Sequence, residues 1–361
     1  MRVQRLGIDG IEQEIEQQRA FVSDRNPAYE RLLGLALSEL EHGLGDLLEE
    51  AWAKRSFAAF YERPLLLLAA IRYDALCEGP SHPLYAAIAG EPPDPEAASA
   101  AALRAATDKQ RARFFRALCT RAIQTNETSR AVTWLWPASL LARAGVQQPI
   151  ALCDLGTSAG LNLGADALPS PWIDADGRSL AVQPRPPVAL RLGFDIAPLD
   201  ARDSDTAQWL RACVWPGESA RLQRLEQAIA AFTALAESDQ APELRRCALP
   251  DAPAQLSGLP ADCCALALQT IVRDYLAPDV FQRYDAAMHA WLRERPALRA
   301  LWSQLELIKD APSAEQVAGI TVRFVDRSGS LRELLLARTH PHPHKLFIQP
   351  AAVAELIEAF A

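Results

Sequence analysis

The sequence lacks any long apolar run. The longest, residues 65–71, stops at Arg72 and is far shorter than the roughly 20 residues that a helix needs to cross a bilayer. The start of the chain also lacks the apolar segment and the small-residue cleavage site of a secretory signal. We therefore expect a cytoplasmic protein with no membrane partner.

Paired cysteines and an excess of basic charge are missing as well. The seven cysteines, at positions 77, 119, 153, 213, 247, 263 and 264, have the spacing of neither a disulfide framework nor a zinc site. The formal net charge of -8 disfavours a large basic surface that would follow the phosphates of a nucleic acid. We expect a reducing compartment, no structural metal and no nucleic-acid partner.

What is present is the composition of a folded chain, with 50% hydrophobic and 23% charged residues. From Gln13 to about Ala144, apolar residues recur at intervals of three and four, which predicts helices. After Pro149 the pattern changes to short apolar runs that alternate with helical stretches. We expect an all-helical region at residues 1–125, which serves as a lid or cap, and an α/β domain at 126–361.

The α/β domain begins with the apolar run Ile150-Ala-Leu-Cys-Asp154, which predicts a strand that ends in a carboxylate and is followed by a glycine-rich turn and a helix. Alternating strands and helices predict a largely parallel sheet covered on both faces, and the short final turns predict an antiparallel hairpin at its end. Further strands are expected at 188–194, 246–249, 263–271, 305–308, 320–325, and 333–338 or 346–348.

Three interpretations compete for the turn in the run Asp154-Leu-Gly156-Thr-Ser158-Ala-Gly160-Leu-Asn162-Leu. In a nucleotide-binding loop, Gly156 permits the sharp turn, Gly160 lets helix and strand pack closely, and backbone N–H groups face the ligand. In a hydrolase, the same residues are G-x-S-x-G, and Ser158 attacks an acyl carbon. The third interpretation is a turn with only a structural role.

Three observations favour cofactor binding over a hydrolase. Asp154 can accept hydrogen bonds from a ligand amino group and ribose, whereas a nucleophile elbow has no need of a carboxylate there. No H-G-G-G oxyanion segment is present, and the preceding region is helical where a hydrolase would have strands. Asp195 closes the next expected strand, where nucleotide-binding folds place the acid that binds ribose. A hydrolase triad of Ser158 with Asp274 or Asp310 and a histidine in 340–344 remains the alternative.

About twice the expected ~20 residues separate Gly156 from Asp195, which indicates an insertion. Residues 169–187 contain two short apolar runs around an Asp-Gly turn, a pattern typical of a hairpin. The hairpin is either decoration or a flap over the site. Farther along, an extra helix is expected at about 205–235.

Two polar segments complete the candidate site. In Gln124-Thr-Asn126-Glu127, either Thr125 or Asn126 caps a helix with Glu127 in its first turn, or Asn126 and Glu127 face the cofactor pocket. The run His340-Pro-His342-Pro-His344 contains no carboxylate or cysteine, so we expect a surface turn and no metal, with His342 at the pocket edge as the alternative.

Four runs resemble a known family: Gln124-Thr-Asn126-Glu127, Asp154-Leu-Gly-Thr-Ser-Ala-Gly-Leu-Asn-Leu163, Trp209-Leu-Arg-Ala-Cys-Val-Trp-Pro216 and His340-Pro-His342. Over nearly the whole chain, the sequence resembles the domain of unknown function 2332 family of bacterial proteins. That family looks like class I S-adenosylmethionine-dependent methyltransferases. The resemblance implies a Rossmann-like, methyltransferase-type α/β fold with a mostly parallel seven-stranded sheet, a terminal antiparallel hairpin and an all-helical N-terminal region.

The resemblance also implies site residues. Asp154, Gly156 and Gly160 would form the cofactor loop together with Ser158 and Asn162, Asp195 would bind ribose, and Asp251 would contact adenine. The sequence departs from the family twice: Pro250-Asp251-Ala252 stands where Gly-Asp-Ala is expected, and Gln269-Thr270 stands where a His-Ser pair is expected. The catalytic candidates are accordingly Gln269, Thr270 and His342, and the loss of a histidine weakens general-base catalysis at the strand end.

These observations predict a protein that binds S-adenosylmethionine and transfers its methyl group to a small molecule. Two alternatives stay open. One is a protein that binds the cofactor without catalysis, and the other is a serine esterase that uses Ser158.

Overall fold

The computed structural model describes residues 8–57 and 59–361, and the chain forms two compact units. The helical unit comprises Met1–Thr125 and Asp203–Gln223, and the sheet unit comprises Asn126–Arg202 and Arg224–Ala361. Residues 1–7 and 58 of the expected helical region lie outside the described residues. A second segment, distant in sequence, thus belongs to the helical unit.

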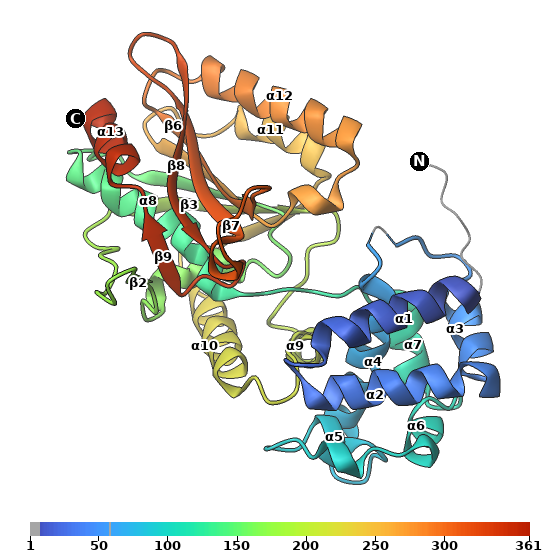
Figure 1. Ribbon diagram of the computed structural model, residues 1–361. Coiled ribbons are helices and arrows are strands. Elements are labelled where there is room, and N and C mark those ends of the chain that lie inside the picture. The colour runs from blue at the N-terminus through green and yellow to red at the C-terminus, as the bar shows by residue number, and fades with distance from the viewer. Residues whose placement is uncertain (1–7, 58) are drawn as a thin grey trace. The chain divides into compact units, whose positions relative to one another are not determined.

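The helical unit packs its helices around an apolar core (Figure 1). The central helix α4 is buried on most sides, as expected for a helix whose apolar residues run all round it. The helices are α1 (Ile8–Val22), α2 (Pro27–Glu39), α3 (Leu44–Trp52), α4 (Glu62–Glu78), α5 (Tyr85–Ile88), α6 (Ala100–Ala106), α7 (Ala112–Thr120) and α9 (Ser204–Cys213).

The sheet unit contains one mixed sheet of nine strands, in the order β2-β9-β8-β7-β6-β5-β1-β3-β4. Strands β4, β3, β1, β5 and β6 are parallel, whereas β7, β8 and β9 continue the sheet through antiparallel pairs. The strands are β1 (Ile150–Leu155), β2 (Ile173–Asp174), β3 (Val188–Asp195), β4 (Glu243–Arg246), β5 (Cys264–Thr270), β6 (Ala300–Leu307), β7 (Ala318–Val325), β8 (Leu331–Thr339) and β9 (Lys345–Ile348).

The expected count of seven strands is wrong. The two-residue strand β2 joins the edge of the sheet by pairing with β9, and both late segments, which the sequence offered as alternatives, are strands. Such short strands are stable only through their pairing partners, so they leave a weak local pattern. The turn after β1 leads into the expected helix, which is the 3-10 helix Leu161–Ala167.

Helices cover both faces of the sheet (Figure 1). Side chains alternate along β1: Ile150 and Leu152 pack on one face with α8 (Val132–Arg143) and α13 (Pro350–Phe360), while Ala151 and Cys153 pack on the other face. That second face is covered by α11 (Ala252–Leu256) and α12 (Pro278–Glu294). The remaining helix, α10 (Ser219–Ala236), packs beside the 3-10 helix that follows β1.

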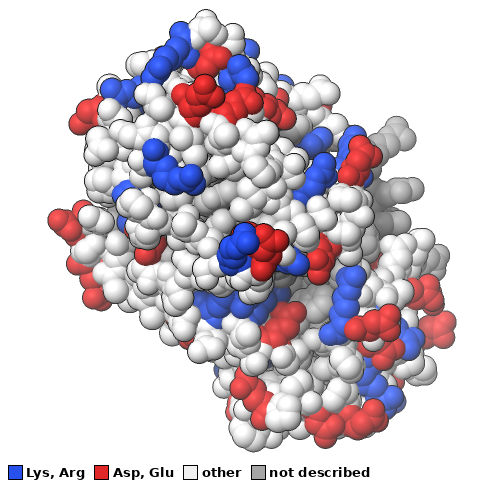
Figure 2. All heavy atoms as spheres, turned by 60° about the vertical axis from the view of Figure 1, so that its left-hand side comes forward, with Lys and Arg blue, Asp and Glu red and all other residues white. Residues whose placement is uncertain are grey.

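On the face of the molecule seen in Figure 2, basic and acidic side chains lie interspersed. No helix within residues 8–57 and 59–361 is both long and apolar enough to cross a membrane. All seven cysteines are free thiols.

Candidate functional site

The connections that follow β1 and its neighbour β5 run to opposite faces of the sheet. The chain leaves β1 toward the face covered by α8, because the 3-10 helix Leu161–Ala167 packs in that core, whereas it leaves β5 toward the face covered by α12. Strands β1 and β5 are neighbours. In open sheets with parallel strands, a crevice for ligands forms at the carboxyl ends of such a pair. The turn 156–160 lies at that edge.

The turn has the backbone of a sharp reversal. Gly156, Ser158 and Gly160 have φ angles of 85°, 52° and 74°, in the left-handed region. At Gly160 an added Cβ would lie 2.8 Å from Cδ2 of Leu244 and 3.0 Å from Cε2 of Phe232. The sequence therefore needs glycine at 160 for both conformation and space, whereas Ser158, with a side chain, holds a conformation that few such residues adopt.

Asp195, the last residue of β3, fixes this turn. Its Oδ2 accepts a hydrogen bond of 2.8 Å from the backbone N–H of Ser158, and its Oδ1 accepts one of 2.9 Å from the N–H of Ala197. The N–H groups of Gly156 and Thr157 donate to the carbonyl of Phe194, at 2.8 and 3.1 Å. The acid that the sequence assigned to ribose thus has a positioning role, although each carboxylate oxygen still has a lone pair for a ligand.

Asp154 lies beneath the turn and is almost wholly buried, with 2% of its surface exposed. Its Oδ2 accepts a hydrogen bond of 3.0 Å from the hydroxyl of Thr157. Burial, reinforced by the nearby charge of Asp195, raises the pKa of Asp154 to about 7. A buried carboxyl group that titrates near neutral pH is a recurrent feature of functional sites.

Asn126 and Glu127 reach the same region from the segment before α8. The side-chain amide of Asn126 donates to the hydroxyl oxygen of Ser158 at 3.1 Å. Glu127 is the N-cap of the 3-10 helix Thr128–Ala131, because its Oε1 accepts from the N–H of Ser129 at 3.1 Å. The expected cap at Thr125 or Asn126 is therefore wrong by one or two positions, and Asn126 is left to contact the turn.

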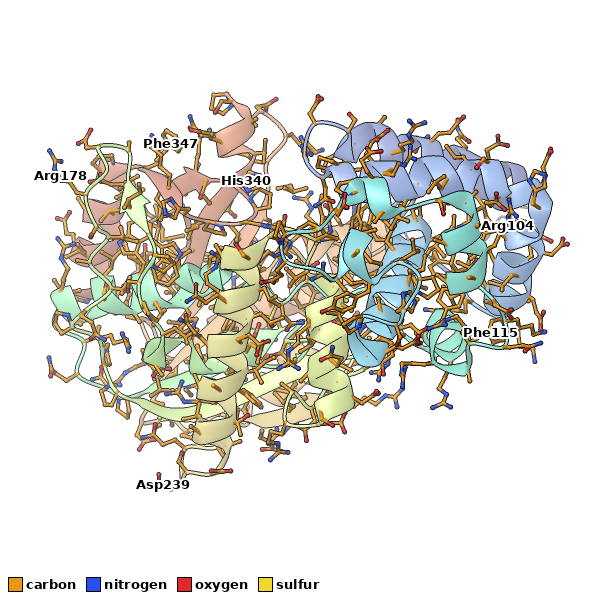
Figure 3. The ribbon with its side chains drawn as sticks, turned by 90° about the horizontal axis from the view of Figure 1, so that it is seen from below. Arg104, Phe115, Arg178, Asp239, His340 and Phe347 are labelled. Atoms are coloured by element: carbon orange, nitrogen blue, oxygen red, sulfur yellow. The ribbon has the colours of Figure 1, made fainter. Side chains whose placement is uncertain are left out.

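The loop between β8 and β9 brings a histidine to Glu127. Nδ1 of His342 lies 3.7 Å from Oε2 of Glu127, and the carbonyl of Pro341 accepts a hydrogen bond of 2.9 Å from Nε of Arg130. Figure 3 labels His340, whose ring centre lies 5.6 Å from that of His342. In the described part of the chain, no three histidines, cysteines or acids form a group that would hold a metal ion.

Gln269, near the end of β5, uses both ends of its amide inside the protein. Its Nε2 donates to Oε1 of Glu306 at 2.6 Å, and its Oε1 accepts from the hydroxyl of Tyr284 at 2.7 Å and from Nε1 of Trp302 at 3.2 Å. Glu306 also accepts from the N–H of Val272, and burial raises its pKa. Glu306 thus holds the loop after β5 and is itself held by Gln269. Tyr284 and Glu306 carry no motif by which the sequence could have indicated them.

The remaining candidates are less involved in these contacts. Thr270 is half-buried at the last position of β5, and Asp251 is exposed in the 3-10 helix Leu249–Asp251 that follows β4. The carbonyl of Asn162 accepts a hydrogen bond of 2.9 Å from Nε1 of Trp134, and its buried Oδ1 has no partner among the described residues. Asn162 therefore offers an acceptor two residues beyond the turn.

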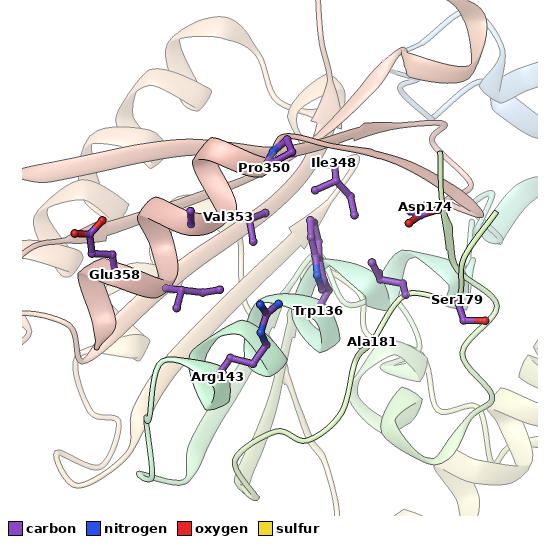
Figure 4. Close-up of a pocket in the computed structure, with 12 residues that line it drawn as sticks. Trp136, Arg143, Asp174, Ser179, Ala181, Ile348, Pro350, Val353 and Glu358 are labelled. Atoms are coloured by element: carbon purple, nitrogen blue, oxygen red, sulfur yellow. The ribbon is translucent and has the colours of Figure 1, made fainter. Parts of the chain in front are cut away.

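Two cavities of the sheet unit lie beside the inserted segment 169–187. The larger, of about 610 Å³, is lined by α8, α13, β9 and the insertion (Figure 4). The smaller, of about 90 Å³, is lined by residues that include Thr128, Trp172 and Arg224. The turn 156–160 lines neither of these two cavities, whereas residues of the insertion line both.

The fold and the candidate site define an α/β protein with a glycine turn and a buried carboxyl group at the carboxyl edge of its parallel strands. The chain belongs to the family described as uncharacterized protein conserved in bacteria (DUF2332), whose model matches residues 13–347. No curated protein and no solved structure matches it. The comparisons thus establish the family, and the chemistry has to be argued from the site.

Proposed function

We propose that the sheet unit is a Rossmann-like, methyltransferase-type domain that binds S-adenosylmethionine at the carboxyl edge of β1 and β3 and methylates a small molecule. The order β4-β3-β1-β5-β6 of its parallel strands supports this. If these five strands are numbered along the chain without β2, their order is 3-2-1-4-5, which is the order of doubly wound nucleotide-binding sheets. The antiparallel strand β7 beside β6 agrees with the terminal hairpin that the family resemblance implies.

The observation that carries the proposal is the state of Asp154. Among the described residues, the hydroxyl of Thr157 donates a hydrogen bond to Asp154. The pKa of Asp154 is near 7 because this hydrogen bond does not offset the cost of burying a charged carboxylate. A ligand with a positively charged amino group would supply that compensation. S-adenosylmethionine carries such a group and a sulfonium, so the residues present fit the cofactor.

The surrounding polar groups fit the rest of an adenosine-bearing ligand. Asp195 has free lone pairs on both oxygens for the two ribose hydroxyls, in addition to the backbone hydrogen bonds that it accepts. Because those backbone bonds hold Ser158 in its left-handed conformation, the turn is organised before the ligand arrives. Pre-organisation of this kind lowers the entropic cost of binding.

When bound, S-adenosylmethionine supplies a methyl group on a positively charged sulfur, an electrophile with a good leaving group. The protein then has to orient the acceptor and exclude water, and alignment alone provides much of the rate. This agrees with a site where Gln269 is committed to Tyr284, Trp302 and Glu306 and does not act as a base.

A thermal-shift series with S-adenosylmethionine and S-adenosylhomocysteine tests the proposal. At a ligand concentration of 100 times Kd, we expect a stabilisation of about 2.7 kcal/mol, which is a shift of several degrees in Tm for a domain of this size. Asp154→Asn should remove most of the shift. Asp239→Asn, at an exposed position (Figure 3), is the matched control and should keep it. Absence of any shift in the native protein would rule the proposal out.

A protein that binds the cofactor but does not catalyse is distinguished by a second measurement. The native protein is incubated with S-adenosylmethionine and a pool of bacterial small molecules, and S-adenosylhomocysteine is quantified. Formation above that of the Asp154→Asn variant supports transfer, whereas tight binding with no product supports the non-catalytic alternative.

Serine ester hydrolysis is the second candidate, because Ser158 combines the G-x-S-x-G pattern with a φ angle of 52° after a buried central strand. The amide of Asn126 donates to its hydroxyl oxygen, however, and a lone pair used in this way is less available for attack on an acyl carbon. We expect a fluorophosphonate probe to leave the native protein unlabelled. Labelling that disappears in Ser158→Ala would establish the esterase instead.

A further inference from the structure

We propose that the cavity of about 610 Å³ beneath the inserted segment binds an organic acid with an apolar body, at a site separate from the turn 156–160. Its volume falls in the range of ~300–1,000 Å³ that is typical of small-molecule sites. The cavity lies on the side of the sheet that bears α8 and α13, and β9 forms part of its wall (Figure 4).

The interior of the cavity is apolar and suits a hydrocarbon or ring. Trp136 of α8 lies at its centre, and Ile348 and Val353 approach from β9 and α13 (Figure 4). Ile357 of α13 also lines the cavity. The three aliphatic side chains are only partly buried, unlike Trp136, which is 3% exposed. Contact with a ligand would remove their remaining apolar surface from water, which is favourable.

The insertion forms the wall opposite α13. This gives a role to the predicted hairpin of residues 169–187, which the proposed cofactor site does not use. Asp174, Ser179 and Leu180 line the cavity from this segment. The hairpin is held by Asp174, whose Oδ1 accepts from the N–H groups of Asp176 and Arg178, both at 2.9 Å. Its Oδ2 lies 4.0 Å from Nη1 of Arg178, so groups of the hairpin itself compensate the charge of Asp174.

Two further charges remain at the cavity. Arg143, in the last turn of α8, and Glu358, in the last turn of α13, have no ion pair or hydrogen bond to any described residue. Figure 4 shows Arg143 on α8, the helix that also carries Trp136, and Glu358 on α13. Because a guanidinium forms a paired hydrogen-bond interaction with a carboxylate, the ligand should carry a carboxylate at the end of its apolar body.

Isothermal titration with octanoate, octylamine and 1-octanol tests the class of ligand. We expect octanoate to bind most tightly and to lose about tenfold in affinity in Arg143→Gln, because a charge-assisted pair is lost. Glu358→Gln should raise the affinity for octanoate by about two- to fivefold, since it removes a like charge. Tighter binding of octylamine, or the opposite response of the two variants, would overturn the proposal.

The location is tested by filling the cavity. Ala354 is exposed on α13 and lines the cavity, so Ala354→Trp should abolish octanoate binding without disturbing the core. Ala351→Trp, exposed on the same helix but outside the lining, is the control and should bind normally. Equal binding by both variants would place octanoate elsewhere, and a dimer that dissociates only in Ala354→Trp, with no octanoate binding by the native protein, would assign this face to a second copy of the chain.

Discussion

Replacing Asp154 by Asn is expected to stabilise the ligand-free protein at pH 8 by up to about 4 kcal/mol. The pKa of Asp154 is raised from 3.8 to about 7, mainly by burial, and a shift of about three units corresponds to about 4 kcal/mol between the two protonation states. Asparagine is neutral and nearly isosteric. Its side-chain carbonyl can keep the hydrogen bond from Thr157, so the cost of the buried charge disappears.

The pH dependence of this effect has a definite sign. Between about pH 4 and pH 7 the folded protein holds a proton on Asp154 that the unfolded chain has lost, so stability falls as the pH rises through this window. The advantage of Asp154→Asn should therefore be full above pH 7 and fade toward pH 4. Urea unfolding of both proteins at pH 8, 6 and 4.5 measures it, with Asp239→Asn as control. An advantage independent of pH would show that it does not arise from titration of Asp154.

The same substitution separates stability from function. If Asp154 binds a cationic ligand group, the variant should be more stable and yet bind S-adenosylmethionine poorly, since the buried charge is kept at a cost to folding. The urea experiment on the free protein remains interpretable even if the cofactor does not bind.

Gly160→Ala is expected to destabilise the sheet unit by about 2–4 kcal/mol. The φ angle of 74° costs an alanine about 1 kcal/mol or more, and overlap of its Cβ with Leu244 and Phe232 adds about 1–3 kcal/mol. Gly177→Ala is a matched control, because Gly177 has a similar φ of 83° but no atom within 4 Å of an added Cβ. Its cost should be about 1 kcal/mol.

The difference between the two variants isolates the packing of the turn against β4 and α10. Chemical denaturation measures it, and near-equal losses would mean that Leu244 and Phe232 move aside at little cost. Gly160→Ala, if it folds, should then be tested for binding of S-adenosylmethionine, because a displaced turn would carry Ser158 away from Asp195.

The centre of the sheet was predictable because its signals are local. The run Ile150-Ala-Leu-Cys-Asp-Leu155 is buried on both faces, and a central parallel strand of this kind is apolar without alternation. The strand over 264–270 was recognisable for the same reason, and the strand ending at Asp195 has the same buried character in its second half. The edge was predictable only in part: the segment 346–348 was offered as an alternative to 333–338 and is β9, whereas β2 has two residues and depends on its pairing with β9.

The candidate site was predictable in part. Glycines at 156 and 160 indicate a turn wherever they stand, because only that residue adopts left-handed backbone without cost. By contrast, nothing near Gln269 in sequence shows that Tyr284, Trp302 and Glu306 would use its amide, 15 to 37 residues away. Likewise, the contact of Glu127 with His342 depends on a loop at the other end of the unit.

By itself, the sequence determined a helical region followed by an α/β unit, the strand that ends at Asp154 and Leu155, and the glycine turn after it, because hydrophobic periodicity and backbone freedom act between near neighbours. The tertiary structure alone decided the nine-stranded order, the burial that brings the pKa of Asp154 to about 7, the role of Asp195 in holding the turn, and the cavity between α8 and α13. These features depend on contacts between segments that are distant in sequence. Desolvation and hydrogen bonding at such contacts are not local properties of the chain.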